Sequence, residues 1–137
     1  MRDLLIVTHG KFGEELIKSA AMIIGENESI HAISLMPEEG PTDLQQKIEQ
    51  LIDQKPTLKD AIVMADLLGG TPCNVLLRMM DDHPNWAVYS GVNLPMILSF
   101  VNQQFLESEE DRIMADGKEG IVDIRVLKTS LLMDEDE

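Results

Sequence analysis

The chain has little that could form covalent cross-links or bind polyanions. Cys73 is the single cysteine among 137 residues, so no internal disulfide can form. Aromatic residues make up only 4% of the chain, so aliphatic residues and nine methionines must fill the core. Eleven lysines and arginines stand against 25 acidic residues, which gives a net charge of −14. This charge argues against nucleic acid and anionic membranes as partners and favours a basic protein.

Segments that would direct the chain to or through a membrane are also missing from the sequence. No apolar run approaches the roughly 20 residues of a membrane-spanning helix. Met1-Arg2-Asp3 leads straight into an apolar segment, without the pattern of a signal peptide. With 44% hydrophobic residues, the chain can build one ordinary core. We therefore expect a cytoplasmic protein with a single domain.

Apolar runs typical of strands alternate with stripes typical of helices. Gly25 is expected to end the first helix and Asn93 to cap the fourth, whereas Pro37 and Pro41 punctuate a loop. The pattern predicts an α/β fold with an open, doubly wound, mainly parallel sheet and helices on both faces. The expected strands are 4–7, 30–35, 61–65, 85–90 and a last one over 121–126, and the expected helices are 12–24, 44–52, 71–80, 93–101 and 109–118.

Chemically useful residues gather where the first, third and fourth strands are expected to end. The segments are Thr8-His9-Gly10, Asp66 to Asn74 and Ser90 to Pro95, and Met36-Pro37 follows the second strand. In open parallel sheets, ligands bind beyond the carboxyl ends of the strands. These loops therefore mark one rim of the sheet as the candidate site.

His9 and Asp66 form the central pair at this rim. A neutral imidazole is a good nucleophile, and the partner of one ring nitrogen decides which nitrogen stays free. Asp66 could accept a hydrogen bond from one nitrogen and leave the other unprotonated. In the alternative, non-functional interpretation, Asp66 is a helix cap or a solvated loop residue.

The glycines after Asp66 are suited to an anion. Gly69, Gly70 and Thr71 precede an expected helix, where free backbone N–H groups and the helix dipole attract phosphate. Thr71 could also donate through its hydroxyl. The segment is neither a Walker motif nor a G-x-G-x-x-G fingerprint, and we expect no cofactor.

The remaining candidates are weaker. Cys73 lies in the first turn of the same helix, where a thiolate can be favoured, but a small semi-buried apolar residue is the more ordinary interpretation. His31 within a strand and His83 in a turn are interpreted as structural or exposed. Three scattered histidines and one cysteine lack metal-ligand spacing, so we expect no metal site.

Three segments together resemble the IIA component of the mannose family of the sugar phosphotransferase system. They are Val7-Thr8-His9-Gly10, Asp66-Leu67-Leu68-Gly69-Gly70-Thr71-Pro72-Cys73-Asn74 and Ser90-Gly91-Val92-Asn93-Leu94-Pro95-Met96. The resemblance covers residues 1–126 in order, as one phosphocarrier domain, and leaves 127–137 as an acidic tail. It implies that His9 is phosphorylated on Nε2, that Asp66 orients it, and that the Thr71 hydroxyl lies near the phosphoryl group.

The resemblance also implies partners and an oligomeric state. A phosphocarrier of this family takes phosphate from the histidine phosphocarrier protein and passes it to a IIB subunit, which phosphorylates sugar entering through membrane components. Contact with the membrane would therefore be indirect. The family forms homodimers in which a C-terminal strand is exchanged between subunits, a role that the predicted antiparallel strand over 121–126 would fill.

Three other functions stay open from the residues alone. A receiver-type signalling domain phosphorylated on Asp66 would have the same fold class, but it needs an acidic pair after the first strand to hold Mg²⁺. A phosphocarrier subunit of a dihydroxyacetone kinase shares the histidine fold, but its segment after the aspartate differs. A cysteine hydrolase would use Cys73 with His9.

Overall fold

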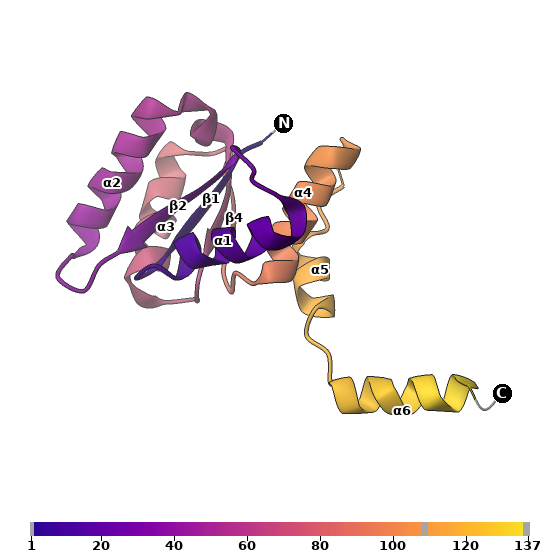
Figure 1. Cartoon of the computed structure of the whole chain (residues 1–137). Helices are drawn as coiled ribbons and strands as arrows, with labels where there is room; N and C mark the ends of the chain where they lie inside the picture. Colours follow the sequence, from indigo (N-terminus) through magenta and orange to yellow (C-terminus); the bar gives the residue numbers. More distant parts are fainter. Residues whose placement is uncertain (1, 108–109, 136–137) are drawn as a thin grey trace.

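Four parallel strands form one sheet in the order β2-β1-β3-β4. The computed structural model describes residues 2–107 and 110–135 (Figure 1). Leu4 pairs with Ile30 on one side of β1 and with Ile62 on the other, so β1 is central. The strands are β1 (Leu4–His9), β2 (Ile30–Leu35), β3 (Ile62–Ala65) and β4 (Ala87–Tyr89).

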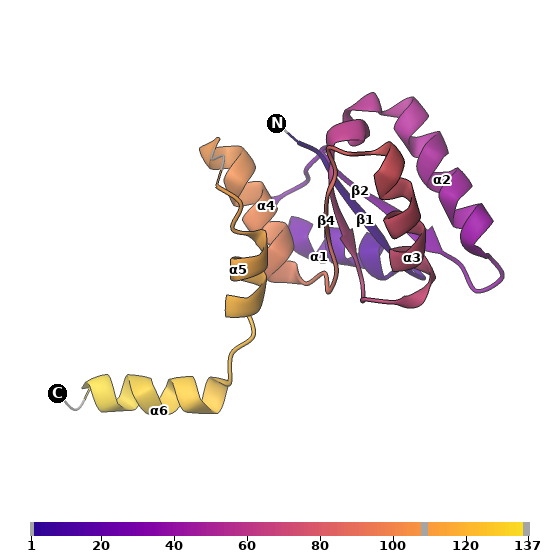
Figure 2. The same ribbon diagram turned by 180° about the vertical axis from the view of Figure 1, so that it is seen from behind.

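Alternate residues of β1 serve two separate cores, as the two-residue period of a strand requires. Leu5 and Val7 belong to the cluster packed against α2 (Pro41–Gln54) and α3 (Gly70–Met79). Leu4 and Ile6 belong to the cluster on the other face, with α1 (Phe12–Ile24) and α4 (Leu94–Leu106). Figures 1 and 2 show these two helix pairs on opposite sides of the sheet. The α/β fold with a parallel sheet covered on both faces is confirmed.

Helix boundaries agree with the local sequence signals in most places. Gly25 follows α1 with a φ of 76°, a left-handed value that favours glycine. The Asn93 side chain accepts a hydrogen bond from Met96 N at 3.0 Å and caps α4. Pro41, predicted in a loop, is instead the first residue of α2, where its missing N–H costs nothing. Two short 3-10 helices, η1 (Pro56–Asp60) and η2 (Met80–Asp82), complete this part.

The predicted strand over 121–126 is wrong. Residues 121–123 have no regular structure, and the helix α6 (Ile124–Glu135) begins immediately after them. Asp123 starts this helix, because its carboxylate accepts Val126 N–H at 3.1 Å and its carbonyl accepts Leu127 N–H at 3.0 Å. A helix satisfies its backbone hydrogen bonds internally, whereas a strand needs a neighbour.

The segment before α6 packs on the body of the molecule. The helix α5 (Ile113–Glu119) lies against α4, whereas α6 projects away from the sheet (Figure 1). The weak helix predicted over 109–118 corresponds to α5, which begins only at Ile113. Residue 109 lies outside the described residues. The Tyr89 hydroxyl donates to the Asp111 carboxylate and ties β4 to this segment. Burial and this hydrogen bond raise the pKa of Tyr89 to about 12.

The described residues include no membrane-crossing helix. In the ranges 2–107 and 110–135, none of the helices has the length and apolar character that a bilayer span requires.

Candidate functional site

The candidate site lies where β1 and β3 end side by side. His9 is the last residue of β1, and Asp66 directly follows β3. The register pairs Val7 with Ala65, so the next residues of both strands reach the same rim. Parallel pairing of adjacent strands thus brings together two residues that are 57 positions apart.

Asp66 holds His9 by two hydrogen bonds to one carboxylate oxygen. Oδ2 accepts the backbone N–H of His9 at 2.9 Å and lies 2.8 Å from its Nδ1. Oδ1 accepts Leu67 N–H at 3.0 Å. An ionised carboxylate can only accept, so Nδ1 carries the proton and Nε2 of a neutral ring keeps its lone pair. The Asp66 side chain is 10% exposed and that of His9 is 49% exposed, so the carboxylate is largely buried whereas about half of the His9 side chain is open to solvent.

The first residue of α3 lies directly against the His9 ring. A Cβ placed on Gly70 would lie 3.1 Å from Cε1 and 3.4 Å from Nε2 of His9. Gly69 and Gly70 have φ values of 81° and 73°, a left-handed conformation that is energetically costly for residues with a side chain. The N-terminus of a ten-residue helix, with its free N–H groups and positive dipole end, is therefore close to Nε2. Thr71, the second residue of α3, is partly buried beside these glycines.

The loop after β2 supports the same rim. Gly10 N–H donates to the carbonyl of Leu35 at 2.7 Å, so the turn after His9 rests on the end of β2. Glu39 fixes the next turn by accepting Met36 N–H at 2.8 Å and by pairing with Lys47. The hydrogen bond from Lys47, followed by that from Met36, lowers the pKa of Glu39.

The other histidines have partners of their own, and the cysteine is buried. His31 Nε2 is 3.3 Å from Asp3 Oδ2 near the amino ends of β1 and β2, and its side chain is only 12% exposed. His83 stacks on Trp86 with ring centroids 4.2 Å apart. Cys73 is buried in the first turn of α3. Among residues 2–107 and 110–135, no three acidic, histidine or cysteine side chains form a group that could hold a metal ion.

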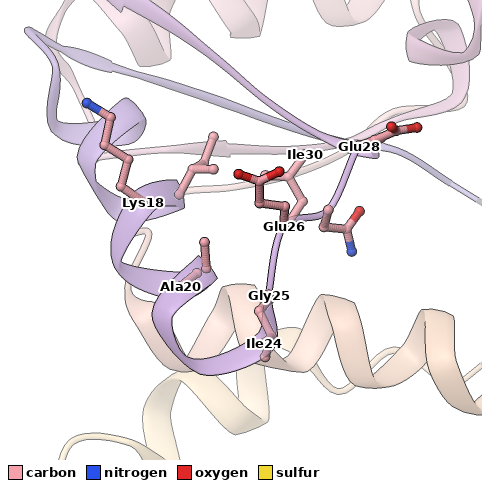
Figure 3. A pocket seen from close by; sticks show the side chains of 10 residues that line it. Lys18, Ala20, Ile24, Gly25, Glu26, Glu28 and Ile30 are labelled. Carbon is pink, nitrogen blue, oxygen red and sulfur yellow. The ribbon is translucent and has the colours of Figure 1, made fainter.

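A separate hollow of about 280 Å³ lies between the end of α1 and the start of β2 (Figure 3). Its wall is apolar at Ala20, Ile24 and Ile30, and Glu26 reaches over it. The Lys18 ammonium points away from the hollow and donates to Glu15 at 3.1 Å. Because its lining includes the end of α1 and the first residue of β2, this hollow lies near the amino ends of the strands, whereas His9 lies at the carboxyl end of β1.

We expect Gly70→Ala to weaken folding and to displace the His9 ring. The left-handed backbone and the contact with Cε1 should together lower the free energy of unfolding by about 1–3 kcal/mol. Denaturant unfolding measures the first effect, and the ring signals of His9 in NMR spectra measure the second.

Gly25→Ala is the matched control for this substitution. Gly25 has a φ of 76°, but a Cβ there would meet no atom within 4 Å. Gly25→Ala should therefore destabilise the protein while leaving the His9 signals unchanged. Equal His9 spectra for the two variants would mean that Gly70 does not set the position of the ring.

Comparisons with known proteins identify relatives of the whole domain. Residues 3–116 match the family model EIIA-man, described as PTS system fructose IIA component. The mannose-specific EIIAB component of Escherichia coli (strain K12) is 30% identical over 122 residues, which cover 86% of this chain and 38% of that protein. The chain thus spans under two fifths of that relative. The fructose-specific EIIA component of Bacillus subtilis (strain 168) is 30% identical over 102 residues, covering 74% of this chain and 70% of that protein.

Solved structures show the same fold. The phosphotransferase system component EIIA from Streptococcus agalactiae superposes with a TM-score of 0.80 and 28% identity, covering 92% of this chain and 99% of the other. The mannose/sorbose specific IIA subunit from Enterococcus faecalis gives a TM-score of 0.75 at 27% identity, covering 89% and 93% of the two chains.

Proposed function

Because the chain belongs to the EIIA-man family, the mannose-family IIA components of the phosphotransferase system, we propose that it carries a phosphoryl group on Nε2 of His9. The observation that carries this proposal is the 2.8 Å contact between His9 Nδ1 and Asp66 Oδ2. It leaves Nε2 unprotonated, on a half-exposed side chain and beside the N-terminus of α3. The donor is the histidine phosphocarrier protein, and the acceptor is a histidine of a IIB subunit that works in sugar uptake.

The transfer exchanges one P–N bond for another. The Nε2 lone pair attacks phosphorus, the bond to the donor histidine breaks, and its electron pair returns to the donor ring. Nδ1 of His9 keeps its proton, and the Asp66 carboxylate stabilises the positive charge that develops on the ring. The backbone N–H groups of Gly69, Gly70 and Thr71 would donate hydrogen bonds to the phosphoryl oxygens, and the Thr71 hydroxyl would be a further donor. Transfer to IIB runs through the same steps in reverse.

The surroundings of His9 suit protein partners. Three apolar side chains near the rim are strongly exposed: Phe12 by 49%, Leu67 by 50% and Leu68 by 78%. The His9 side chain is half-exposed, so a side chain of another protein can approach it. With a net charge of −14, the chain favours partners with a basic surface. With these partners, the protein would act in the cytoplasm and would contact the membrane only through the transporter complex.

The direct experiment is incubation with phosphoenolpyruvate, enzyme I and the histidine phosphocarrier protein, followed by mass spectrometry. We expect a gain equal to one phosphoryl group, stable in base and labile in acid, as a phosphoramidate is. A base-labile adduct would indicate an aspartyl phosphate and favour a receiver-type domain. A protein that gains no mass would contradict the proposal.

We expect the chain to form a homodimer that buries the apolar side chains of its C-terminal segment. Ile121 is 79% exposed, Ile124 is 76% exposed and Val126 is 61% exposed, and Leu131, seven residues after Ile124, lies on the same side of α6 as Ile124. Such a surface invites association. Light scattering at micromolar concentration should give twice the monomer mass.

Replacing both Ile124 and Leu131 by serine should shift the protein towards the monomer. Met22→Ser is the matched control, because Met22 is 90% exposed on α1, away from this segment. A wild-type protein that stays monomeric, with phosphorylation intact, would remove the dimer from the proposal.

A further inference from the structure

Thr8 lies behind His9, on the other face of the sheet. Side chains of a strand alternate, so His9 faces α3 whereas Thr8 joins Leu4 and Ile6 on the face covered by α1. Thr8 is completely buried, and a Cβ placed on Gly13 would lie 3.2 Å from its methyl carbon. The first turn of α1 is therefore packed closely on this threonine.

The buried hydroxyl of Thr8 makes two hydrogen bonds that fix the turn after His9. Oγ1 accepts Gly13 N–H at 2.9 Å, one of the donors that the start of α1 leaves unpaired. The same hydroxyl donates to the carbonyl of Gly10 at 3.1 Å. It thus connects the residue after His9 to the first turn of the helix. Gly10 has a φ of 54°, a conformation that this connection helps to hold.

The two hydrogen bonds complete a set that surrounds the His9 backbone. The Asp66 carboxylate accepts the backbone N–H of His9, and the Leu35 carbonyl accepts the N–H of Gly10. The Thr8 hydroxyl donates to the Gly10 carbonyl. Two of these three contacts come from residues at the ends of the neighbouring strands β2 and β3. The third comes from Thr8 of β1, whose hydroxyl also accepts the N–H of Gly13 in α1.

We propose that the Thr8 hydroxyl is a positioning group for His9, which holds the turn so that Nδ1 stays on Asp66 and Nε2 stays beside Gly70. Thr8 touches no reacting atom and acts through the backbone of residues 9 and 10. The inference rests on the proposed phosphocarrier function for its effect on rate, but its effect on the ring can be measured without phosphorylation.

The test compares variants with and without the hydroxyl. Thr8→Val has nearly the same shape but leaves Gly13 N–H and the Gly10 carbonyl without this partner, whereas Thr8→Ser keeps both hydrogen bonds. We expect Thr8→Val to slow phosphorylation of His9 roughly ten- to hundredfold, as for a small misplacement of a reacting group. Thr8→Ser should react nearly as fast as wild type. Thr8→Ala, which cannot overpack the site, should resemble Thr8→Val.

A spectroscopic measurement separates positioning from general stability. In the unphosphorylated protein, ring nitrogen shifts of His9 should report one tautomer, protonated on Nδ1, in wild type and Thr8→Ser. They should report a mixture of tautomers in Thr8→Val and Thr8→Ala. Ile6→Val is the matched control, since it removes a buried methyl group on the same face of β1 without touching the hydroxyl. It should lower stability while leaving the tautomer and the rate as in wild type.

The outcomes distinguish this inference from the proposed function. Native tautomer and rate in Thr8→Val, or an equal loss in Thr8→Ser, would overturn the positioning role. If wild type gained no phosphoryl group at all, the proposed function would fail, and the tautomers would still decide whether Thr8 positions His9.

Discussion

His9→Ala protein is expected to gain no phosphoryl mass in the presence of phosphoenolpyruvate, enzyme I and the histidine phosphocarrier protein. The substitution removes the only atom proposed to attack phosphorus, so the loss should be complete and not partial. His9 is half-exposed, so its removal should leave the fold intact, which circular dichroism can verify. Phosphorylation of His9→Ala protein at the wild-type level would remove His9 from the mechanism.

The chain contains a second histidine–aspartate pair that serves as a matched control. His31 Nε2 lies 3.3 Å from Asp3 Oδ2, but the His31 side chain is only 12% exposed. The Thr57 hydroxyl also donates to this Asp3 oxygen, at 2.9 Å. His31→Ala and His83→Ala should therefore be phosphorylated like wild type. A histidine beside a carboxylate is common to both pairs, whereas exposure and an adjoining helix N-terminus distinguish His9.

Asp66→Asn should slow phosphorylation of His9 by roughly two or more orders of magnitude. The amide keeps the shape but removes the charge that stabilises the developing imidazolium. It also offers a donor where the backbone N–H of His9 and its Nδ1 need an acceptor. Asp66 lies behind the ring, at Nδ1, so its charge is separated from the incoming phosphate by the imidazole. Rapid-quench measurement of the transfer rate decides this prediction.

Asp3→Asn removes the same charge from the partly buried pair with His31 and provides the control for Asp66→Asn. Its transfer rate should equal that of wild type, although its stability can fall. If Asp66→Asn also reacted at the wild-type rate, another group would have to orient His9. The carboxylate would then be only a cap for the loop after β3.

Much of the rim followed from the order of strands and helices. Once alternating elements imply parallel pairing, the carboxyl ends of the strands must lie along one rim, and His9 and Asp66 stand at two of those ends. The sequence did not predict that β1 and β3 are neighbours, which the structure shows. The glycines at the start of α3 predicted a backbone that turns tightly or approaches a ligand, but not that Gly70 lies against the His9 ring, which the structure shows. The roles of His9, Asp66, Thr71 and the glycines in phosphoryl transfer stay predictions.

Two features depended on information outside a short window of sequence. The alternation over residues 121–126 resembles a strand, but Asp123 can cap a helix, and Ile124, Leu127 and Leu131 recur at helical spacing. The contest between strand and helix is decided by whether a neighbouring strand is available, which the segment itself does not encode. The pairing of His31 with Asp3 likewise depends on how the N-terminal residues lie beside β2.

The role of Thr8 was also hidden in the sequence. A threonine next to an apolar run is typical of a strand, and its hydroxyl carries no motif. Only the close packing of Gly13 brings a free N–H of α1 to this oxygen. A small residue at the second position of the helix is the one local sign that the helix and strand approach closely there.

The single tryptophan gives this protein one natural optical probe, and its place limits what that probe can report. Trp86 is 7% exposed, and its indole N–H donates to the carbonyl of Leu58 at 2.8 Å. It precedes β4, at the amino ends of the strands, and belongs to the core beneath α2 and α3. Intrinsic fluorescence therefore follows the assembly of that layer. The chemical state of His9, at the far end of the sheet, has to be followed by mass or by NMR.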